Sequence, residues 1–202
     1  TEWADIKRQI NENGIQIIGD MPIYVSGDSA DVWTQREMFK MAPKNAEAKI
    51  RKARAARYKK AEEEAKKAGT SVPSYVDCED DPIPETALVF DKAAGVPPDY
   101  FSEDGQLWGN PLYDWDALKK DGYGWWIRRV DGCAKLYDAL RIDHFRGFES
   151  YWAVPYGDKT ARNGVWEKGP GMALVGVLRD WFHDTPIIAE DLGFLTDEVR
   201  QL

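Results

Sequence analysis

The clearest pattern in the sequence is a short apolar run that ends on an acidic residue and occurs three times. The runs cover residues 15–20, 139–143 and 186–190, and their last residues are Asp20, Asp143 and Glu190. Such runs are typical of buried strands. Each is followed by a loop and by a segment in which apolar residues recur at helical spacing. This alternation predicts an α/β fold with a parallel sheet or barrel.

Helices are predicted by the same patterning. Trp3, Ile6 and Ile10 share one helical face, and Gly14 is a natural stop for that helix. Further helices are expected over residues 29–39 with Ser29 as cap, 116–140, 171–182, and after Thr196 as N-cap. Residues 95–115 are dense in Gly, Pro and aromatic residues, which predicts a structured loop rather than a regular element.

Residues 41–94 differ in character from the rest of the chain. Ala, Lys, Arg and Glu dominate 45–68, which predicts an exposed helix with pairs such as Lys60–Glu64. An acidic run follows its basic half, so a solvated helix is favoured over an RNA-binding surface. Residues 69–91 are predicted as an acidic loop, with a short strand at 87–90. We therefore divide the chain into segments 1–40, 41–94 and 95–202, with 41–94 as an inserted helical and loop subdomain.

Composition narrows the choice of partners. The net charge of −8 argues against nucleic acid and anionic membranes as partners, because phosphate binding needs clustered Lys and Arg. No apolar run approaches the roughly 20 residues of a membrane span. We expect no signal peptide, because residues 1–14 are predicted to form an amphipathic helix. Cys78 and Cys133 match no metal or redox spacing, so we expect two reduced thiols in a cytoplasmic protein. Nine Trp residues suit either sugar faces or an aromatic core.

The three acidic residues are the candidate chemistry. In a (β/α)8 barrel the functional groups lie at the carboxyl ends of the strands, where Asp20, Asp143 and Glu190 would converge. Two converging carboxyl groups suit retaining glycoside chemistry, in which one attacks the anomeric carbon and the other protonates the leaving oxygen. Arg141 lies on the same side of its strand as Asp143 and should favour the ionised form of Asp143. Burial should raise the pKa of Glu190 and keep it protonated.

Other interpretations of these residues stay open at this point. An acidic residue after a strand is often a turn former, and Mg²⁺-dependent barrel enzymes use the same layout with carboxylate ligands. Arg141 and Arg146 argue against a metal, because cations there would repel it. His144 is a ligand, a substrate contact or a core histidine. The interval from Asp20 to Asp143 is too long for one crossover, which predicts a subdomain that forms a wall over the site.

Six strings in the sequence resemble glycoside hydrolase family 77, the amylomaltases or disproportionating enzymes of maltodextrin and starch metabolism. They are Ile18–Val25, Asp28–Trp33, Gly95–Ser102, Gly105–Trp115, Arg141–Gly147 and Ile188–Gly193. The resemblance covers most of the chain outside about residues 41–93. It implies a (β/α)8 barrel of the α-amylase clan, of which this chain holds about strands 3 to 5.

The resemblance also implies roles for individual residues. Asp143 would be the nucleophile at the end of the fourth strand, Glu190 the general acid/base at the end of the fifth, and Arg141 a catalytic partner. The substrate contacts that it implies are Asp20, Tyr24, Trp108, Asn110, His144 and Asp191. The activity expected is that of a 4-α-glucanotransferase acting on maltodextrins or other α-1,4-glucans, with no metal and no cofactor.

One departure from the family pattern affects what this chain can do. The family carries a third carboxylate in a His-Asp-Asn motif near the seventh strand, and the 202 residues contain no such motif. We therefore expect residues 1–202 alone to be an incomplete, inactive part of the enzyme. The alternatives are a metal-dependent barrel enzyme with carboxylate ligands and a non-catalytic glucan-binding fragment. The sequence leaves open the donor and product lengths, the role of residues 41–94 and the oligomeric state.

Overall fold

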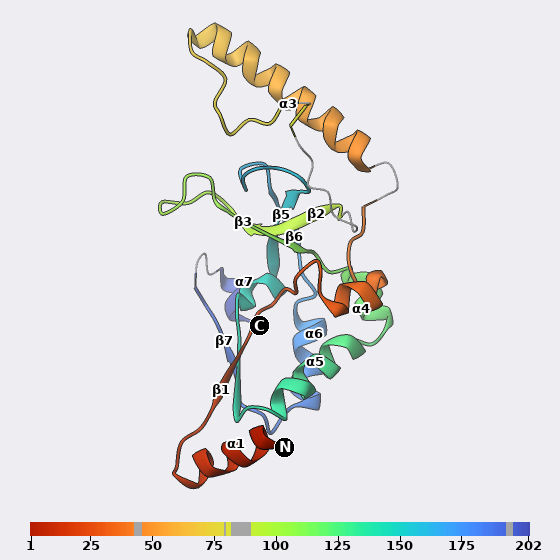
Figure 1. Ribbon diagram of the computed structural model, residues 1–202, viewed down its shortest axis with the longest axis vertical. Coiled ribbons are helices and arrows are strands. Elements are labelled where there is room, and N and C mark those ends of the chain that lie inside the picture. The colour runs from red at the N-terminus through yellow and green to blue at the C-terminus, as the bar shows by residue number, and fades with distance from the viewer. Residues whose placement is uncertain (43–45, 79, 82–89, 193–195) are drawn as a thin grey trace. The chain divides into compact units, whose positions relative to one another are not determined.

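The computed structural model describes residues 1–42, 46–78, 80–81, 90–192 and 196–202 (Figure 1). The elements, in chain order, are α1 (Glu2–Glu12), β1 (Ile18–Met21), α2 (Ala30–Thr34), η1 (Arg36–Met38), α3 (Ala46–Ala68), β2 (Lys92–Val96), β3 (Gln106–Pro111), α4 (Trp115–Lys120), α5 (Gly124–Ala134), β4 (Ala139–Ile142), η2 (Phe145–Phe148), β5 (Ser150–Pro155), β6 (Val165–Lys168), α6 (Met172–Trp181), β7 (Ile187–Ala189) and α7 (Asp197–Arg200).

The chain forms two compact units, which are described separately. Unit 1 comprises Thr1–Ile23, Asp114–Tyr151 and Lys168–Leu202, and unit 2 comprises Tyr24–Tyr113 and Trp152–Glu167. Unit 2 is thus the subdomain expected after the first strand, although its predicted role as a wall over the site stays a prediction. The division into sequence segments 1–40, 41–94 and 95–202 also stays a prediction.

Unit 1 contains the parallel sheet that the three apolar runs predict. Its strand order is β1-β4-β7, and both neighbouring pairs run parallel. The strands β4 and β7 lie where the sequence places them. The first strand begins at Ile18, three residues later than predicted, and continues past Asp20 to Met21.

The two faces of this sheet differ in burial. Gly19, Met21, Leu140 and Ile142 are buried on one face, and Gly19 packs so closely on Tyr137 that a Cβ would lie 2.1 Å from the ring. On the opposite face Ile18 is 58% and Ile188 43% exposed, although Ala139 is buried. The predicted burial of the first strand is therefore correct for one face only.

The helices of unit 1 agree with the helices predicted from the sequence, with one exception. The hydroxyl of Thr1 accepts a hydrogen bond from the Ala4 amide to cap α1, and Gly14, at φ +76°, follows the end of that helix. The predicted helix over 116–140 is instead two helices, α4 and α5, with Gly122 and Tyr123 between them in the left-handed region. A left-handed residue cannot continue a right-handed helix, so the chain turns there.

Unit 2 contains a four-stranded sheet of order β3-β2-β5-β6. The strand β2 pairs antiparallel with both β3 and β5. The prediction of a loop without regular elements over 95–115 is wrong, because Gln106–Pro111 forms β3. Gly95 explains the misinterpretation: it lies within β2, where a Cβ would be 2.4 Å from the Gln106 carbonyl oxygen. The strands β5 and β6 were not anticipated, and the strand expected at 87–90 lies outside the described residues except for Phe90, which forms a bridge with Met41.

The helix α3 is one uninterrupted rod, drawn in orange in Figure 1. The predicted pair Lys60–Glu64 is present at 4.0 Å, between two exposed side chains. The prediction of an exposed helix is wrong for one face, however, because Arg54 has 0% and Ala65 only 7% of its surface exposed. A buried guanidinium requires polar partners, since an isolated buried charge is very costly.

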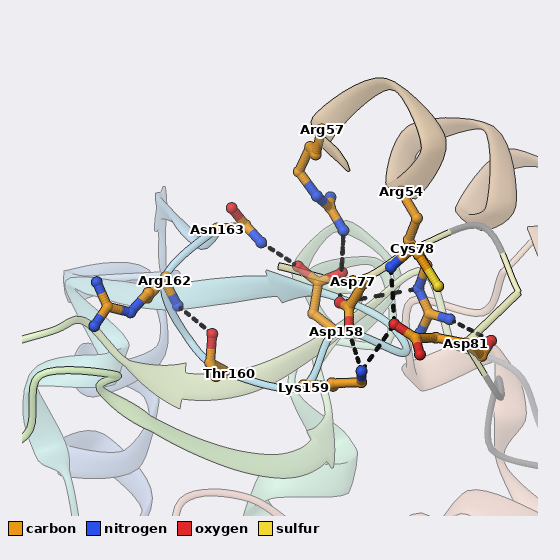
Figure 2. Close-up of polar contacts among 10 residues, drawn as sticks. All are labelled: Arg54, Arg57, Asp77, Cys78, Asp81, Asp158, Lys159, Thr160, Arg162 and Asn163. Atoms are coloured by element: carbon orange, nitrogen blue, oxygen red, sulfur yellow. Dashed lines mark hydrogen bonds and ion pairs between the residues drawn. The ribbon is translucent and has the colours of Figure 1, made fainter. Parts of the chain in front are cut away.

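Figure 2 shows those partners, which we call the α3 charge cluster. Its members are Arg54, Arg57, Asp77, Asp81, Asp158 and Lys159. Arg54 Nη1 donates to the Asp81 carbonyl oxygen at 2.9 Å, and Arg57 Nη2 lies 2.6 Å from Asp158 Oδ1. Within unit 2 the cluster joins α3 to the segment around residues 77–81 and to the connection between β5 and β6.

The cysteines and the hydropathy of the helices were also considered in the sequence. Cys78 and Cys133 are both free thiols. In the part of the chain that the structure describes, no helix is both long enough and apolar enough to cross a membrane.

Candidate active site

The parallel sheet of unit 1 brings Asp143 and Glu190 to the same level. The Asp143 amide donates to the Met21 carbonyl at 3.0 Å, and the Glu190 amide donates to the Ile142 carbonyl at 3.1 Å. Because Ile142 is paired with Ala189, the next residue of each strand lies one step beyond the ladder. Side chains alternate along a strand, so both acidic side chains are on the same face as Arg141.

Arg141 lies among three carboxyl groups. Its Nη1 is 2.6 Å from Asp20 Oδ1 and 3.3 Å from Asp143 Oδ1, and its Nη2 is 3.1 Å from Glu190 Oε1. Asp20 is brought there by its register pairing with Arg141. The expected contact between Arg141 and Asp143 is therefore present. Glu190, for which the sequence indicated no neighbouring cation, is in fact paired with the same guanidinium.

The pKa of Asp143 depends on burial, on Glu190 and on Arg141. Burial raises the pKa of the Asp143 carboxyl, and a side-chain hydrogen bond with Glu190 and the negative charge of Glu190 raise it further. Arg141 acts in the opposite direction, as predicted, but it does not outweigh them. The predicted effect of Arg141 on Asp143 is therefore present in direction, although the pKa of Asp143 is raised overall. Two ionised carboxyl groups in contact repel each other, which is why Glu190 raises the pKa of Asp143.

His144 contributes to the site through its backbone. It has φ +51°, in the left-handed region, and its amide donates to Glu190 Oε2 at 2.6 Å. Burial, and then the nearby charge of Arg146, lower the pKa of the imidazole to about 4 against a weaker opposing effect of Asp143. The ring is therefore neutral at pH 7. The sequence identified His144 as a candidate contact, but no sequence signal indicated the left-handed backbone or the amide contact.

The remaining predicted residue of unit 1, Asp191, is exposed. Asp191 and Glu190 are among the residues that line a hollow of about 710 Å³. Most of the other lining residues are apolar, including Ile142, Phe145, Val175, Leu178, Phe182 and Val199. The lining also includes the polar side chains of Arg179, His183, Thr185 and Arg200.

The other predicted contacts, Tyr24, Trp108 and Asn110, lie in unit 2. Tyr24 is buried, with ring centroids 5.9 Å from Tyr113 and 6.2 Å from Trp108. Trp108 is 38% exposed. The Asn110 side-chain amide donates to the Val25 carbonyl oxygen at 2.9 Å, which ties β3 to the chain that follows Tyr24. The structure thus groups the predicted residues into two sets, one in each unit.

The acidic residues do not form a metal-binding group. Among the described residues, no cluster of three or more His, Cys, Asp or Glu side chains has an arrangement that could hold a metal ion. Asp20, Asp143 and Glu190 instead share the Arg141 guanidinium. A divalent cation bound to these oxygens would have to displace that positive charge. The metal-dependent interpretation is therefore not favoured.

Known proteins resemble the chain over its whole length. A 4-alpha-glucanotransferase of Aquifex aeolicus is 45% identical over 201 residues, which are 100% of this chain and 33% of that protein. A chloroplastic/amyloplastic 4-alpha-glucanotransferase of Solanum tuberosum is 39% identical over 100% of this chain and 27% of its own length. The chain thus spans about a third of the length of the curated relatives it matches.

Solved structures give the same result. The amylomaltase from Streptococcus agalactiae in complex with acarbose matches with a TM-score of 0.72 and 38% identity, over 98% of this chain and 32% of that one. The family model Glyco_hydro_77, described as 4-alpha-glucanotransferase, matches residues 1–202. The chain therefore belongs to glycoside hydrolase family 77, the 4-alpha-glucanotransferase family.

Proposed function

We propose that the full-length protein carrying this chain is a 4-α-glucanotransferase that moves α-1,4-glucan segments between maltodextrins. The observation that carries the proposal is the convergence of Asp143 and Glu190 at the ends of two parallel strands, in a chain of this family. The acarbose complex of the Streptococcus agalactiae relative supports a glucan as substrate, because acarbose is a glucan analogue. We also propose that β1, β4 and β7 are the third to fifth strands of a (β/α)8 barrel, in which the more exposed face of the sheet is the barrel interior.

In the proposed mechanism Asp143 is the nucleophile and Glu190 the general acid/base. The Asp143 carboxylate attacks the anomeric carbon while Glu190 protonates the glycosidic oxygen, which leaves with its glucan segment. Glu190 then takes a proton from the 4-hydroxyl of an acceptor glucan, and that oxygen displaces Asp143. The contact between the two carboxyl groups supports this pairing, because the two groups lie close enough together to act on one glycosidic bond.

Arg141 balances the charge of the pair in this mechanism. Without substrate it contacts Asp20, Asp143 and Glu190 together, and it lowers the pKa of Asp143 against the effects of burial and Glu190. When a glucan separates the two carboxyl groups, the effect of Glu190 on Asp143 weakens. Arg141 then favours the ionised nucleophile.

Substrate contacts are proposed for the other predicted residues. In unit 1 these are Asp20, which is exposed beside Arg141, the neutral imidazole of His144, and Asp191. In unit 2 the half-exposed Trp108 offers a ring face to a sugar, and Tyr24 and Asn110 hold the chain around it. We place the protein in the cytoplasm, where free thiols such as Cys78 and Cys133 persist.

The test is glucan transfer by the full-length protein with maltotriose as donor and acceptor. Asp143→Asn and Glu190→Gln should each lower turnover by about 10³-fold or more, because each removes a transition-state interaction. Asp131→Asn is the matched control, since Asp131 makes an exposed i,i+4 pair with Lys135 and should leave turnover unchanged. Near-parental turnover in either catalytic variant would refute the assignment. Loss of parental activity on treatment with a chelator would support a metal-dependent enzyme instead.

A further inference from the structure

The backbone of His144 adopts a left-handed conformation, which is uncommon for a residue other than glycine. His144 and Tyr123 are the two non-glycine residues with positive φ among those that the structure describes. The left-handed region costs an ordinary L-residue roughly 1–2 kcal/mol, because Cβ approaches the carbonyl oxygen. Such a cost persists where surrounding contacts impose it, and these positions often occur at functional sites.

Contacts on both sides of His144 impose this conformation. Its carbonyl accepts a hydrogen bond from the Gly147 amide at 2.9 Å, which closes the turn into η2. Gly147 is tightly packed: a Cβ there would lie 2.7 Å from Ile23 Cδ1 and 3.2 Å from His144 Cδ2. The amide of His144 is consequently directed at Glu190 Oε2, 2.6 Å away.

We propose that His144 is a positioning residue for Glu190, and that it acts through its left-handed backbone amide rather than through its imidazole alone. The inference rests on the proposed role of Glu190 as general acid/base. An amide can donate but cannot accept, so Oε2 of Glu190 is held as an acceptor. The amide thereby fixes the orientation of the Glu190 carboxyl group, whose other oxygen, Oε1, lies 3.1 Å from Arg141 Nη2.

The amide contact bears on both proton transfers. In the first step the proton of Glu190 passes to the glycosidic oxygen as its bond to the anomeric carbon breaks and the Asp143 oxygen bonds to that carbon. The Glu190 carboxylate left behind keeps its hydrogen bond from the His144 amide, which stabilises the new charge. In the second step the acceptor hydroxyl returns a proton to Glu190 as its oxygen displaces Asp143.

The experiment compares three variants of the full-length protein that all lack the imidazole: His144→Gly, His144→Asn and His144→Val. Glycine and asparagine tolerate the left-handed region, whereas valine does not. With maltotriose, His144→Val should have a kcat at least about tenfold below that of His144→Asn, while the two share one KM. Equal kcat values in all three variants would mean that only the side chain matters, and would overturn the proposal.

A second substrate separates positioning of the acid from general damage to the fold. Fluoride leaves without protonation, so α-maltosyl fluoride does not need the acid in the first step. In single turnovers His144→Asn and His144→Val should release fluoride at equal rates. An equal loss with both substrates would overturn the proposal. If His144→Val does not fold, His144→Ala takes its place. The kcat of His144→Ala with maltotriose is then expected to lie below that of His144→Gly.

Failure of this inference can be distinguished from failure of the proposed function. If Asp143→Asn keeps parental transfer, the function is wrong and the inference is overturned with it. If Asp143→Asn abolishes transfer while the His144 variants lose activity equally, the function stands and the inference alone is overturned.

Discussion

Replacing Arg54 by Met should weaken the attachment of α3 to the rest of unit 2. The Arg54 and Asp77 side chains are each 1% exposed, with Nε and Oδ2 4.0 Å apart. The replacement keeps most of the side-chain volume but removes the charge and the hydrogen bond to the Asp81 carbonyl. Asp77 is then left buried with less compensation, which is the costly way to break a buried ion pair.

The structure sets the size of the effect. Removing one partner of a buried pair costs about 3–5 kcal/mol. Two other cations stay near Asp77, with Lys159 at 3.6 Å and Arg57 at 4.0 Å, and they offset part of the loss. We therefore expect about 3 kcal/mol, at the lower end of that range. Adding Asp77→Leu should restore much of the stability, because no uncompensated carboxylate is then buried at that position.

The assay is hydrogen exchange of the α3 amides in the full-length protein, read by mass spectrometry. The opening free energy of α3 should fall by the stated amount in Arg54→Met and recover in the double variant. Lys60→Met is the control on the same helix, because its pair with Glu64 is exposed and should contribute under about 0.5 kcal/mol. If Arg54→Met changes exchange no more than Lys60→Met, the α3 charge cluster does not hold the helix.

Two further predictions concern pH and the isolated chain. Burial alone would raise the pKa of Glu167, but hydrogen bonds from Lys40 and Lys92 outweigh it and lower the pKa to about 2. The ionised Glu167 therefore stabilises the folded protein fully above pH 4.5, and this stabilisation is lost as the pH falls toward 2. Glu167→Gln should accordingly be less stable than the parent at pH 7 and equally stable near pH 2 in thermal melts. Residues 1–202 expressed alone should be poorly soluble and should release no glucose from maltotriose, since three strands cannot close a barrel; parental turnover that Asp143→Asn abolishes would contradict this.

The parallel sheet was predictable because local sequence and tertiary environment agree there. Residues 139–142 and 186–189 are short apolar runs that contain Ile, are followed by an acidic residue and alternate with helical segments, which together favour strands. The convergence of Asp143 and Glu190 then follows from parallel pairing alone. The capping residues Thr196 and Ser29 were also predictable, because an N-cap depends on one side chain and its next turn.

The antiparallel sheet of unit 2 was not predictable in the same way. The residues of β3 include Gly109 and Asn110, which locally favour turns, and pairing with β2 overrides that preference. The prediction that α3 is exposed on all sides was wrong for a related reason. Its composition indicates solvent exposure, and only the tertiary fold shows that Arg54 lies beside the buried carboxylate of Asp77.

The electrostatics of the site depended on contacts between strands that sequence spacing does not show. Arg141 lies two residues from Asp143, so its contact with Asp143 could be expected. Its contact with Glu190, and the effect of Glu190 on Asp143, depend on the register of β4 with β7. The left-handed conformation of His144 is likewise set by its surroundings, because histidine does not require it.

Trapping the covalent intermediate tests the central claim most directly. The Glu190→Gln variant of the full-length protein lacks the base for the second step, so with α-maltosyl fluoride it should accumulate a glycosyl–enzyme. Mass spectrometry of the intact protein and of its peptides should then find one maltosyl group, attached to Asp143 and absent when Asp143→Asn is added. A maltosyl group on any other residue, or fluoride release over many turnovers by the double variant, would contradict the account.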